Sequence, residues 1–302
     1  RTMDRIRTYP GKHNQRHQES KMKKKLVRLD KLIVDREMLL SRTLAQGYIA
    51  DGRVKVDGIT IKKTASMVPF DCSITVDAPQ KEWVSRGAHK LIRALDLFEI
   101  DPSGMTCIDI GASTGGFTDV LLFRGAKKVY AVDVGYGQLA WKLRNDPRVV
   151  VMERTNARHL TSDMFEGEKA DIIVSDASFI SLKLLLRPLE SLLSNEGRMV
   201  VLVKPQFEVG REKVGRGVVH DPLLHEETLR DLASFIDTET GLELFNSTYS
   251  PIKGPEGNIE FLFLLGTKSN TILKHVNIDF MKLVEEAHEA TQQRQATSDE
   301  DK

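Results

Sequence analysis

From Thr106 onward, short apolar runs alternate along the chain with longer stretches of helical pattern. Runs that are apolar at nearly every position are typical of strands buried on both faces of a parallel sheet. Parallel strands need crossover connections, which are usually helices. The predicted strands are Thr106–Ile110, Val129–Val134, Val149–Glu153, Asp171–Asp176, Met199–Lys204, Leu242–Tyr249 and Ile259–Leu265, and the predicted helices between them include Phe117–Phe123, Leu182–Leu193 and Leu224–Ile236. The pattern predicts an α/β fold with a Rossmann-like sheet covered on both faces.

The two ends of this pattern differ from its middle. The last two predicted strands have no helix between them and are joined only by Pro251–Asn258. We therefore expect an antiparallel hairpin at the end of a mostly parallel sheet. An amphipathic helix, Gly87–Phe98, precedes the sheet, and residues 278–295 are expected to form a final polar helix that frays into a tail.

The segment Leu26–Val76 has a compact, mixed pattern that predicts a small α+β domain. Arg28–Val34 is expected to begin a helix. Ser41–Gly47 is expected to form a second helix, which its serine caps and its glycine ends in a left-handed turn. Gly52–Gly58 alternates in the manner of a strand and ends in Asp-Gly, a signal for a tight hairpin.

These patterns divide the 302 residues into five segments. They are a basic tail (1–25), the small domain (26–79), a linker (80–86), the sheet domain (87–270) and a C-terminal helix with a tail (271–302). The basic tail holds nine Lys and Arg residues against two acidic ones. We expect it to be disordered, and in one interpretation the natural chain starts at Met22. A basic arm that contacts RNA phosphates is the other interpretation.

Composition argues against several classes of protein. No run approaches the roughly 18 apolar residues of a membrane span, and no apolar segment of a signal peptide follows the basic tail. Cys72 and Cys107 are far apart, which gives neither a disulfide framework nor the spacing of a metal site. We therefore expect a cytoplasmic protein with no metal, no membrane partner and no obligate protein partner.

A glycine-rich loop, Asp109–Phe117, follows the first predicted strand and opens the next helix. Glycines there let the backbone turn tightly and approach a ligand closely. The second strand ends about 20 residues on in Asp133, and an acid at that position accepts hydrogen bonds from ribose hydroxyls. The loop lacks the G-x-G-x-x-G of dinucleotide sites, and the chain has no P-loop motif. The spacing favours S-adenosylmethionine over NAD, and a glycine-rich turn without a ligand is the alternative.

The third strand is expected to add to this cofactor site. It ends shortly before Asn156, which either bonds the adenine edge or caps a helix. The predicted cofactor-binding residues are Gly111, Ala112, Ser113, Gly115, Gly116, Phe117, Asp133, Asn156 and Ala157.

Charged residues stand at unusual positions along the same predicted sheet. Asp176 ends the fourth strand, and Lys204 closes the apolar fifth strand, where burying an ammonium is costly. Glu260 is the one acid inside the last apolar strand, and Lys90 on the amphipathic helix can project toward the same edge. For each of them alone the alternative is a solvated or paired surface residue. Together they form a Lys-Asp-Lys-Glu set in chain order, which indicates a site of chemistry.

The residues around Asp176 also separate classes of methyltransferase. An enzyme that acts on amino groups would carry Asn or Asp followed by two prolines and an aromatic residue. Asp176-Ala-Ser-Phe179 lacks both prolines. An enzyme that acts on cytosine C5 would need a nucleophilic cysteine, and neither cysteine is placed for that role.

Eight motifs between about residues 22 and 270 form a specific set: Arg28–Lys31, Ser41-Arg42, Gly52–Val56, Ser85–Leu91, Asp109–Asp119, Val174–Ser181, Leu202–Glu208 and Gly254–Glu260. This set resembles the TlyA family of rRNA ribose methyltransferases, once labelled haemolysins. The catalytic part is similar to the FtsJ/RrmJ class of ribose 2′-O-methyltransferases. The resemblance implies an S4 RNA-binding domain at 26–79, S-adenosylmethionine as cofactor, and Lys90, Asp176, Lys204 and Glu260 as a catalytic tetrad. It also implies 2′-O-methylation of a cytidine ribose in ribosomal RNA or ribosomal subunits.

The expected RNA contacts come from basic residues of the small domain, and a solvated face is the alternative for each. These residues are Arg28, Lys31, Arg42, Arg53 and Lys55. The loop Gly210–Gly217 suits an RNA-facing lid or an ordinary mobile loop. The linker Lys81–Val84 departs from the Arg-x-Trp-Val of the family, because lysine keeps the charge but loses the bidentate fork. A switching role for the linker and a role of Trp83 as an interface anchor are the two alternatives.

The expected reaction needs a ribose hydroxyl in line with the methyl donor and a group that removes its proton. Lys204 is assigned to that hydroxyl as the base, and Asp176 and Glu260 would hold the lysines. The main competing interpretation is a non-catalytic RNA-binding or ribosome-assembly factor, which the complete tetrad disfavours. The lack of a membrane span disfavours a membrane-active cytolysin, and the cofactor loop disfavours a pseudouridine synthase with an S4 domain.

Overall fold

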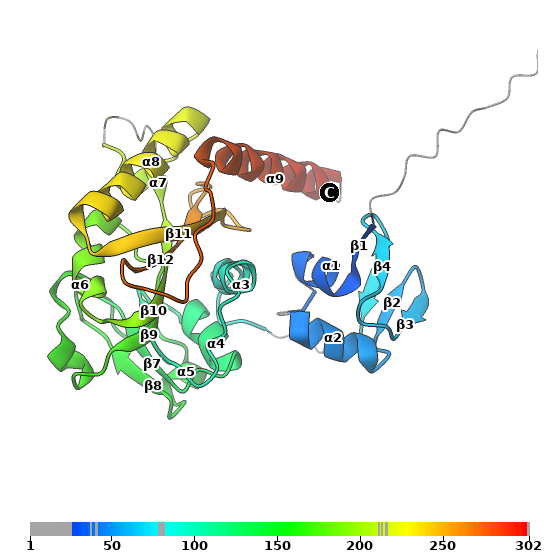
Figure 1. Ribbon diagram of the computed structural model, residues 1–302, viewed down its shortest axis with the longest axis horizontal. Coiled ribbons are helices and arrows are strands. Elements are labelled where there is room, and N and C mark those ends of the chain that lie inside the picture. Colours follow the sequence, from blue (N-terminus) through cyan, green and yellow to red (C-terminus); the bar gives the residue numbers. More distant parts are fainter. Residues whose placement is uncertain are drawn as a thin grey trace, which may run out of the picture. The chain divides into compact units, whose positions relative to one another are not determined.

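The computed structural model describes residues 26–36, 38–39, 42–77, 82–210, 212, 214 and 217–300 (Figure 1). The basic tail, the expected helix cap Ser41 and the linker residue Lys81 lie outside these residues. The chain divides into two compact units, Arg1–Pro79 and Gln80–Lys302. We call them the small unit and the sheet unit.

The small unit has helices and short strands around an apolar core of its own. Its elements are β1 (Leu26–Arg28), α1 (Leu29–Asp35), α2 (Arg42–Ala50), β2 (Val54–Val56), β3 (Ile59–Ile61), β4 (Met67–Pro69) and β5 (Ile74–Val76). Strand β2 pairs with β3 and β5 in an antiparallel sheet, and β1 pairs with β4. The hairpin expected from Asp57-Gly58 is confirmed, because both residues have positive φ, 49° and 81°, as a type I′ turn requires.

Both helices expected in the small unit are present, with bounds that differ from the expected ones. Helix α1 begins at Leu29, because Arg28 still belongs to β1. Helix α2 continues past Gly47 to Ala50, so Gly47 does not end it. The left-handed glycine comes later, at Gly52, where φ is 74°.

The sheet unit is built on a seven-stranded sheet (Figure 1). Its strands are β6 (Thr106–Ile110), β7 (Lys128–Val132), β8 (Val149–Met152), β9 (Ala170–Ser175), β10 (Leu193–Val203), β11 (Leu242–Tyr249) and β12 (Phe261–Thr267). They lie in the order β11-β12-β10-β9-β6-β7-β8. Strands β6 to β10 are parallel, and β12 runs antiparallel to both of its neighbours. The expected mostly parallel sheet with an antiparallel last strand is therefore confirmed.

Helices cover this sheet on both faces. They are α3 (Ala88–Leu97), α4 (Gly116–Phe123), α5 (Trp141–Arg144), α6 (Leu186–Glu190), α7 (Pro205–Glu208), α8 (Pro222–Glu239) and α9 (Phe280–Glu300), with single 3₁₀ turns η1 (Ala157–His159), η2 (Ser162–Phe165) and η3 (Leu182–Leu184). On one face, α6, α8 and α9 contribute to the main apolar core. Helix α4 packs on β7, and α3 packs on α4.

Two predicted helices of the sheet unit differ in the structure. The long helix expected at Leu182–Leu193 is split into η3 and α6, because the chain already enters β10 at Leu193, which pairs with Ala170. The C-terminal helix was expected to be polar. In α9, however, Phe280, Leu283, Val284 and Ala287 are buried in the core, which is the i, i+3, i+4, i+7 stripe of a packed helix.

Candidate active site

Four charged residues that are far apart in the sequence meet at one edge of the sheet. Asp176 directly follows β9, and Lys204 directly follows β10. Glu260 directly precedes β12, outside the strand in which it was expected. Because β12 is antiparallel, its beginning lies at the same edge as the ends of β9 and β10. Helix α3 brings Lys90 to this edge from outside the sheet.

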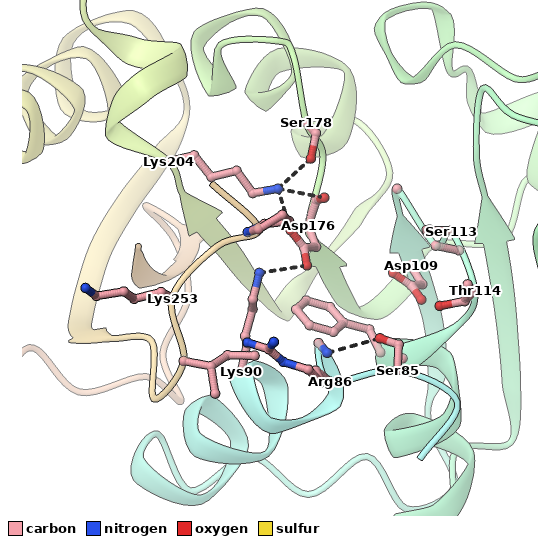
Figure 2. Close-up of a pocket in the computed structure, with 17 residues that line it drawn as sticks. Ser85, Arg86, Lys90, Asp109, Ser113, Thr114, Asp176, Ser178, Lys204 and Lys253 are labelled. Atoms are coloured by element: carbon pink, nitrogen blue, oxygen red, sulfur yellow. Dashed lines mark hydrogen bonds and ion pairs between the residues drawn. The ribbon is translucent and has the colours of Figure 1, made fainter. Parts of the chain in front are cut away.

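The four residues form a chain of ion pairs, most of which Figure 2 shows. The carboxylate of Asp176 is shared, with Oδ1 2.6 Å from Nζ of Lys204 and Oδ2 3.3 Å from Nζ of Lys90. Nζ of Lys90 also lies 2.7 Å from Oε2 of Glu260. Both lysine side chains are only 7% exposed. Alternating charges offset much of the cost of burying four ionisable groups.

Burial and ion pairing have opposite effects on the pKa values of Lys90 and Glu260. Burial disfavours the ammonium of Lys90, but the carboxylates of Asp176 and Glu260 outweigh it, so that the pKa of Lys90 is raised. Burial raises the pKa of Glu260 in spite of the neighbouring ammonium of Lys90. Glu260 therefore depends on the ammonium of Lys90 to keep its charge.

Ser178 is a member of this site that the sequence analysis did not single out. Its Oγ lies 2.6 Å from Nζ of Lys204, which also donates to the backbone oxygen of Asp176 at 3.3 Å. Ser178 is exposed, whereas Lys204 is buried. The only signal in the sequence was its place in the motif Asp176–Phe179.

Three of the four charged residues, Lys90, Asp176 and Lys204, line a cavity, and Asp176 also lines a second one. The first, which we call the tetrad cavity, has about 390 Å³ and is lined by Ser85, Arg86, Gly87, Lys90, Asp109, Gly111, Ala112, Ser113, Thr114, Gly116, Phe117, Asp176, Ser178, Lys204, Ile252, Lys253 and Pro255. The second, the Asp133 cavity, has about 670 Å³, and Asp133, Asn156 and Ala157 are among its lining residues. Gly111, Ser113, Asp176 and Ser178 line both cavities. The two cavities therefore meet at the end of β9.

The glycine loop stands where two strands of the sheet diverge. The chain leaves β6 for β7 on one side and returns to β9 on the other, which is the switch point where ligands bind in such folds. Gly111 has a φ of 77°, and a Cβ there would come within 3.1 Å of the backbone of Ala177. The loop can approach β9 this closely only because that residue is glycine.

Eight of the nine predicted cofactor residues line one of the two cavities, and Gly115 does not. Gly115 precedes α4 with a φ of 99°, and a Cβ there would meet the side chains of Leu139 and Leu143. Contact of Gly115 with the cofactor therefore stays a prediction. This glycine serves the turn into α4 and the packing behind the loop.

Asp133 and Asn156 are both partly engaged by the backbone. Asp133 accepts hydrogen bonds from the amides of Ser113 (2.8 Å) and Gly135 (2.7 Å), one on each carboxylate oxygen. Asn156 caps η1, because its Oδ1 accepts from the amide of Arg158 at 3.0 Å. The capping interpretation of Asn156 is thus confirmed, although its side chain also lines the Asp133 cavity.

Asp109 is a second site residue for which the sequence analysis assigned no role. It is wholly buried and lines the tetrad cavity. Its Oδ2 accepts from the amide and the hydroxyl of Thr118, at 2.9 and 2.7 Å. Its Oδ1 has no hydrogen-bond partner among the described residues. Burial raises the pKa of Asp109 to about 7. A buried, unpartnered carboxylate oxygen at a cavity wall is suited to a cationic ligand.

The end of the linker is fixed to the sheet unit. The ring of Trp83 packs edge-on against Phe123 of α4, with centroids 5.6 Å apart. The amide of Val84 donates to Asp119 of the same helix at 3.2 Å. Trp83 therefore anchors the chain on α4, the helix that the glycine loop opens.

In the small unit, two of the five predicted RNA-binding residues are tied to one buried acid. Asp30 accepts two hydrogen bonds from Arg28 and one from Arg42. The side chain of Arg28 is nevertheless 42% exposed and that of Arg42 is 51% exposed. Arg53 stacks on Tyr48 at 4.4 Å. Lys31 and Lys55 are exposed. The structure thus gives Arg28 and Arg42 a structural partner in addition to a solvent-facing side.

Comparisons with known proteins agree with this architecture. The model of the FtsJ-like methyltransferase family matches residues 83–267, and that of the S4 domain matches residues 27–71. The chain is 48% identical over 248 residues to the 16S/23S rRNA (cytidine-2′-O)-methyltransferase TlyA of Mycobacterium tuberculosis, covering 82% of this chain and 92% of that relative. The chain belongs to the TlyA family of FtsJ-like methyltransferases.

Other members of the TlyA family carry the older name. Hemolysin A of Brachyspira hyodysenteriae is 43% identical over 237 residues, which cover 78% of this chain and 98% of that protein. A solved structure described as a hemolysin from Streptococcus thermophilus is 38% identical, with a TM-score of 0.68 over 90% of this chain and 99% of that one. Within the described residues of this TlyA-family chain, no helix is long and apolar enough to cross a membrane.

The TlyA family and this fold are those of S-adenosylmethionine-dependent methyltransferases. The residues present fit that cofactor. The two cavities meet at a glycine loop that the backbone of β9 approaches closely, and Asp109 offers an unpartnered carboxylate oxygen to a cation. A sulfonium and an amino group are the cationic groups of S-adenosylmethionine.

Proposed function

We propose that this chain transfers a methyl group from S-adenosylmethionine to the 2′-hydroxyl of a cytidine ribose in ribosomal RNA. The observation that carries the proposal is the ion-pair chain of Lys90, Asp176, Lys204 and Glu260, which reaches the meeting point of the two cavities at Asp176. Cytidine and the choice of 16S and 23S rRNA come from the name of the Mycobacterium tuberculosis relative. Both ribosomal subunits are therefore substrates to test.

S-adenosylmethionine would be held along the glycine loop, and it supplies a methyl group activated by a positively charged sulfur. Asp133 would accept from its ribose hydroxyls beyond the two amides it already binds, since each carboxylate oxygen has more than one lone pair. Asp109 would face its cationic end in the tetrad cavity. Asn156 and Ala157 would lie on the adenine side of the Asp133 cavity.

The ribose hydroxyl is a weak nucleophile, so the site has to orient it and remove its proton. We assign the base to Lys204, because it lines the tetrad cavity with its Nζ beside Asp176 and Ser178, and it has to give up its own proton before it can accept one from the ribose. Asp176 orients Lys204 through Oδ1 and Lys90 through Oδ2. Glu260 balances the charge of Lys90. The site thus keeps one lysine charged and places the other for proton transfer.

The basic side chains of the small unit support the choice of an RNA substrate. Lys31 and Lys55 are exposed, and Arg28, Arg42 and Arg53 keep part of their surface toward solvent. Such residues bind phosphates and position an RNA without reading its bases. In the sheet unit, the ring of Phe179 is 91% exposed and is held at a φ of 63° beside Phe207, 5.3 Å away. An exposed aromatic ring beside the site is suited to stacking on a base.

The test uses the full chain, labelled S-adenosylmethionine, and 30S and 50S subunits from cells in which its gene is deleted. Nuclease mapping of the label separates ribose from base methylation. Lys204→Ala and Asp176→Ala should lower transfer by about 10²–10⁴-fold, the usual contribution of a general base, with cofactor binding kept. Lys282→Ala, an exposed lysine of α9, is the matched control and should leave the rate unchanged.

Two results would contradict the proposal. Label on a base would exclude ribose chemistry at this site. The absence of label on free RNA, on either subunit and on whole ribosomes would favour the RNA-binding or ribosome-assembly factor considered in the sequence analysis.

A further inference from the structure

Hydrogen-bond acceptors already surround Nζ of Lys204, so that they leave no open side for a substrate hydroxyl. In its charged form, Nζ has three donors, and three oxygen atoms lie around it: Oδ1 of Asp176 at 2.6 Å, Oγ of Ser178 at 2.6 Å and the backbone oxygen of Asp176 at 3.3 Å. Its side chain is 7% exposed. A ribose hydroxyl that reaches Lys204 directly has to displace one of these partners.

Two partners of Lys204 line both cavities, Asp176 and Ser178, and of these Ser178 is the neutral one, since the carboxylate of Asp176 is already shared between Lys204 and Lys90. Ser178 is exposed, it lines the tetrad cavity and the Asp133 cavity, and Lys204 is the one hydrogen-bond partner of its hydroxyl among the described residues. A hydroxyl can donate one hydrogen bond while it accepts others. Figure 2 shows Ser178 directly beside Nζ of Lys204. Its position therefore permits contact with a bound hydroxyl on one side and with Lys204 on the other.

The loop that carries Ser178 is held at its far end. Glu208 of α7 accepts from the hydroxyl of Ser181 at 2.6 Å and from the amide of Leu182 at 2.8 Å. Lys204, at the start of α7, holds the near end through Asp176 and Ser178. One short helix thus fixes both ends of the loop, and the hydroxyl of Ser178 does not depend on solvent for its orientation.

We propose that Ser178 relays the proton of the ribose hydroxyl to Lys204. The proposal rests on the proposed function. The ribose oxygen forms a bond to the methyl carbon while the carbon–sulfur bond breaks and leaves its electron pair on sulfur. The ribose proton passes to Oγ of Ser178, and the hydroxyl proton of Ser178 passes to the lone pair of neutral Lys204. Serine ends unchanged, and the lysine ends as an ammonium held by Asp176.

The relay is tested by single-turnover methylation of the subunits described above, with enzyme in excess. Ser178→Ala should slow the transfer about 10²-fold, at the lower end of what proton-transfer groups contribute. Its dissociation constants for S-adenosylmethionine, measured by calorimetry, and for the subunit should stay within about threefold, because no binding group is removed. Ser178→Thr keeps a hydroxyl and should retain at least about a tenth of the wild-type rate. Ser234→Ala, an exposed serine on α8, is the matched control.

The dependence of the rate on the fraction of heavy water separates a relay from mere positioning. If two protons move in the transition state, the plot of rate against the fraction of heavy water is bowed, which we expect for the wild type. Ser178→Ala should give a straight line in the same plot. A second readout needs no turnover: Lys204 in the free protein should be acetylated faster in Ser178→Ala, because one of its acceptors is gone, and at the wild-type rate in Ser178→Thr.

Three results would overturn the relay: a wild-type rate in Ser178→Ala, a straight line in the wild type, or a bowed dependence that persists in Ser178→Ala. These results leave the proposed function intact as long as Lys204→Ala is inactive and the wild type labels ribose. A wild type that does not label ribose refutes the proposed function itself.

Discussion

Asp109 shows how a single buried carboxyl can link stability to ligand binding. Its pKa is raised by burial from 3.8 to about 7, and the bonds from Thr118 lower it only in part. The unfolded carboxyl loses its proton near 3.8, whereas the folded one loses it near 7. Between these values unfolding releases a proton, so the free energy of unfolding falls as the pH rises through this window and stays lower above it.

Asp109→Asn should therefore stabilise the free protein more at pH 8 than at pH 5. The amide can keep both bonds from Thr118 through its oxygen but carries no charge to bury. Thermal unfolding at the two pH values measures the difference, which we expect to be several degrees. The same variant should bind S-adenosylmethionine more weakly at pH 8, as measured by calorimetry. A stability change of equal size at both pH values would mean that Asp109 does not titrate in this window.

Gly254 makes room for the carboxylate of Glu260. A Cβ at this position would lie 2.6 Å from Oε1 of Glu260, closer than any real contact. Gly254→Ala should push Glu260 away from Lys90 and slow methyl transfer about 10-fold or more, since small displacements in a site have large effects on rate. Gly104→Ala is no suitable control, because that glycine has a φ of 72°. Gly47→Ala in α2 is a suitable control, since no atom lies within 4 Å of the Cβ that it adds. Unchanged turnover in Gly254→Ala would show that Glu260 tolerates a shift.

At the scale of elements, α2 allows a direct test of the corrected helix end. Gly47 lies inside α2, and a Cβ there meets no atom within 4 Å. Gly47→Ala should stabilise the small unit by about 0.5–1 kcal/mol, the usual gain over glycine inside a helix. Hydrogen exchange of residues 42–50 measures it. If Gly47 were the left-handed end expected from the sequence, alanine would destabilise the helix instead.

The strands of the sheet could be predicted because burial on both faces leaves a simple pattern. Strands β6 and β11 match the predicted bounds, and the others differ by a few residues at their ends, apart from an early start of β10. The short strands β1, β4 and β5 of the small unit could not be predicted, because three residues are too few to show an alternation. The stripe of α9 was overlooked because four apolar residues lie among many charged ones.

The charged residues of the candidate site could be predicted because a charge at the end of an apolar strand is conspicuous. Ser178 and the role of Asp109 could not, since a serine in a loop and an acid inside a motif have many ordinary explanations. For Gly115 the sequence could not separate a ligand contact from a packing role, because glycines in one loop look alike in sequence. Gly111 and Gly115 both have positive φ, so only the neighbours Leu139 and Leu143 separate the glycine that faces a cavity from the one that faces the core.

At the scale of the whole molecule, each unit has its own core, so damage to one should spare the other. Asp30 is buried and accepts from Arg28, Arg42 and Gln46; burial opposes its charge, but these hydrogen bonds outweigh it and lower its pKa. Asp30→Asn leaves two guanidinium groups without their carboxylate partner; because both are about half exposed and can be solvated, we expect a cost of about 1.5–3 kcal/mol, the usual range for hydrogen bonds to charged groups.

We expect Asp30→Asn to increase hydrogen exchange across residues 42–77 and to weaken binding to ribosomal subunits. Exchange across β6 and the affinity for S-adenosylmethionine should not change. Asp35→Asn, an exposed acid of the same helix α1, is the matched control. Faster exchange in β6 of the Asp30 variant would show that the two units depend on each other for stability.

Strand β12 is the last strand in the sequence, yet it lies between β10 and β11. Glu260 directly precedes it, so the partner of Lys90 arrives with the final insertion into the sheet. Before β12 inserts, a gap separates β10 from β11, and the site lacks Glu260. Lys90 therefore gains its second carboxylate partner only when the sheet closes around β12, which makes completion of the site part of the last step of sheet assembly.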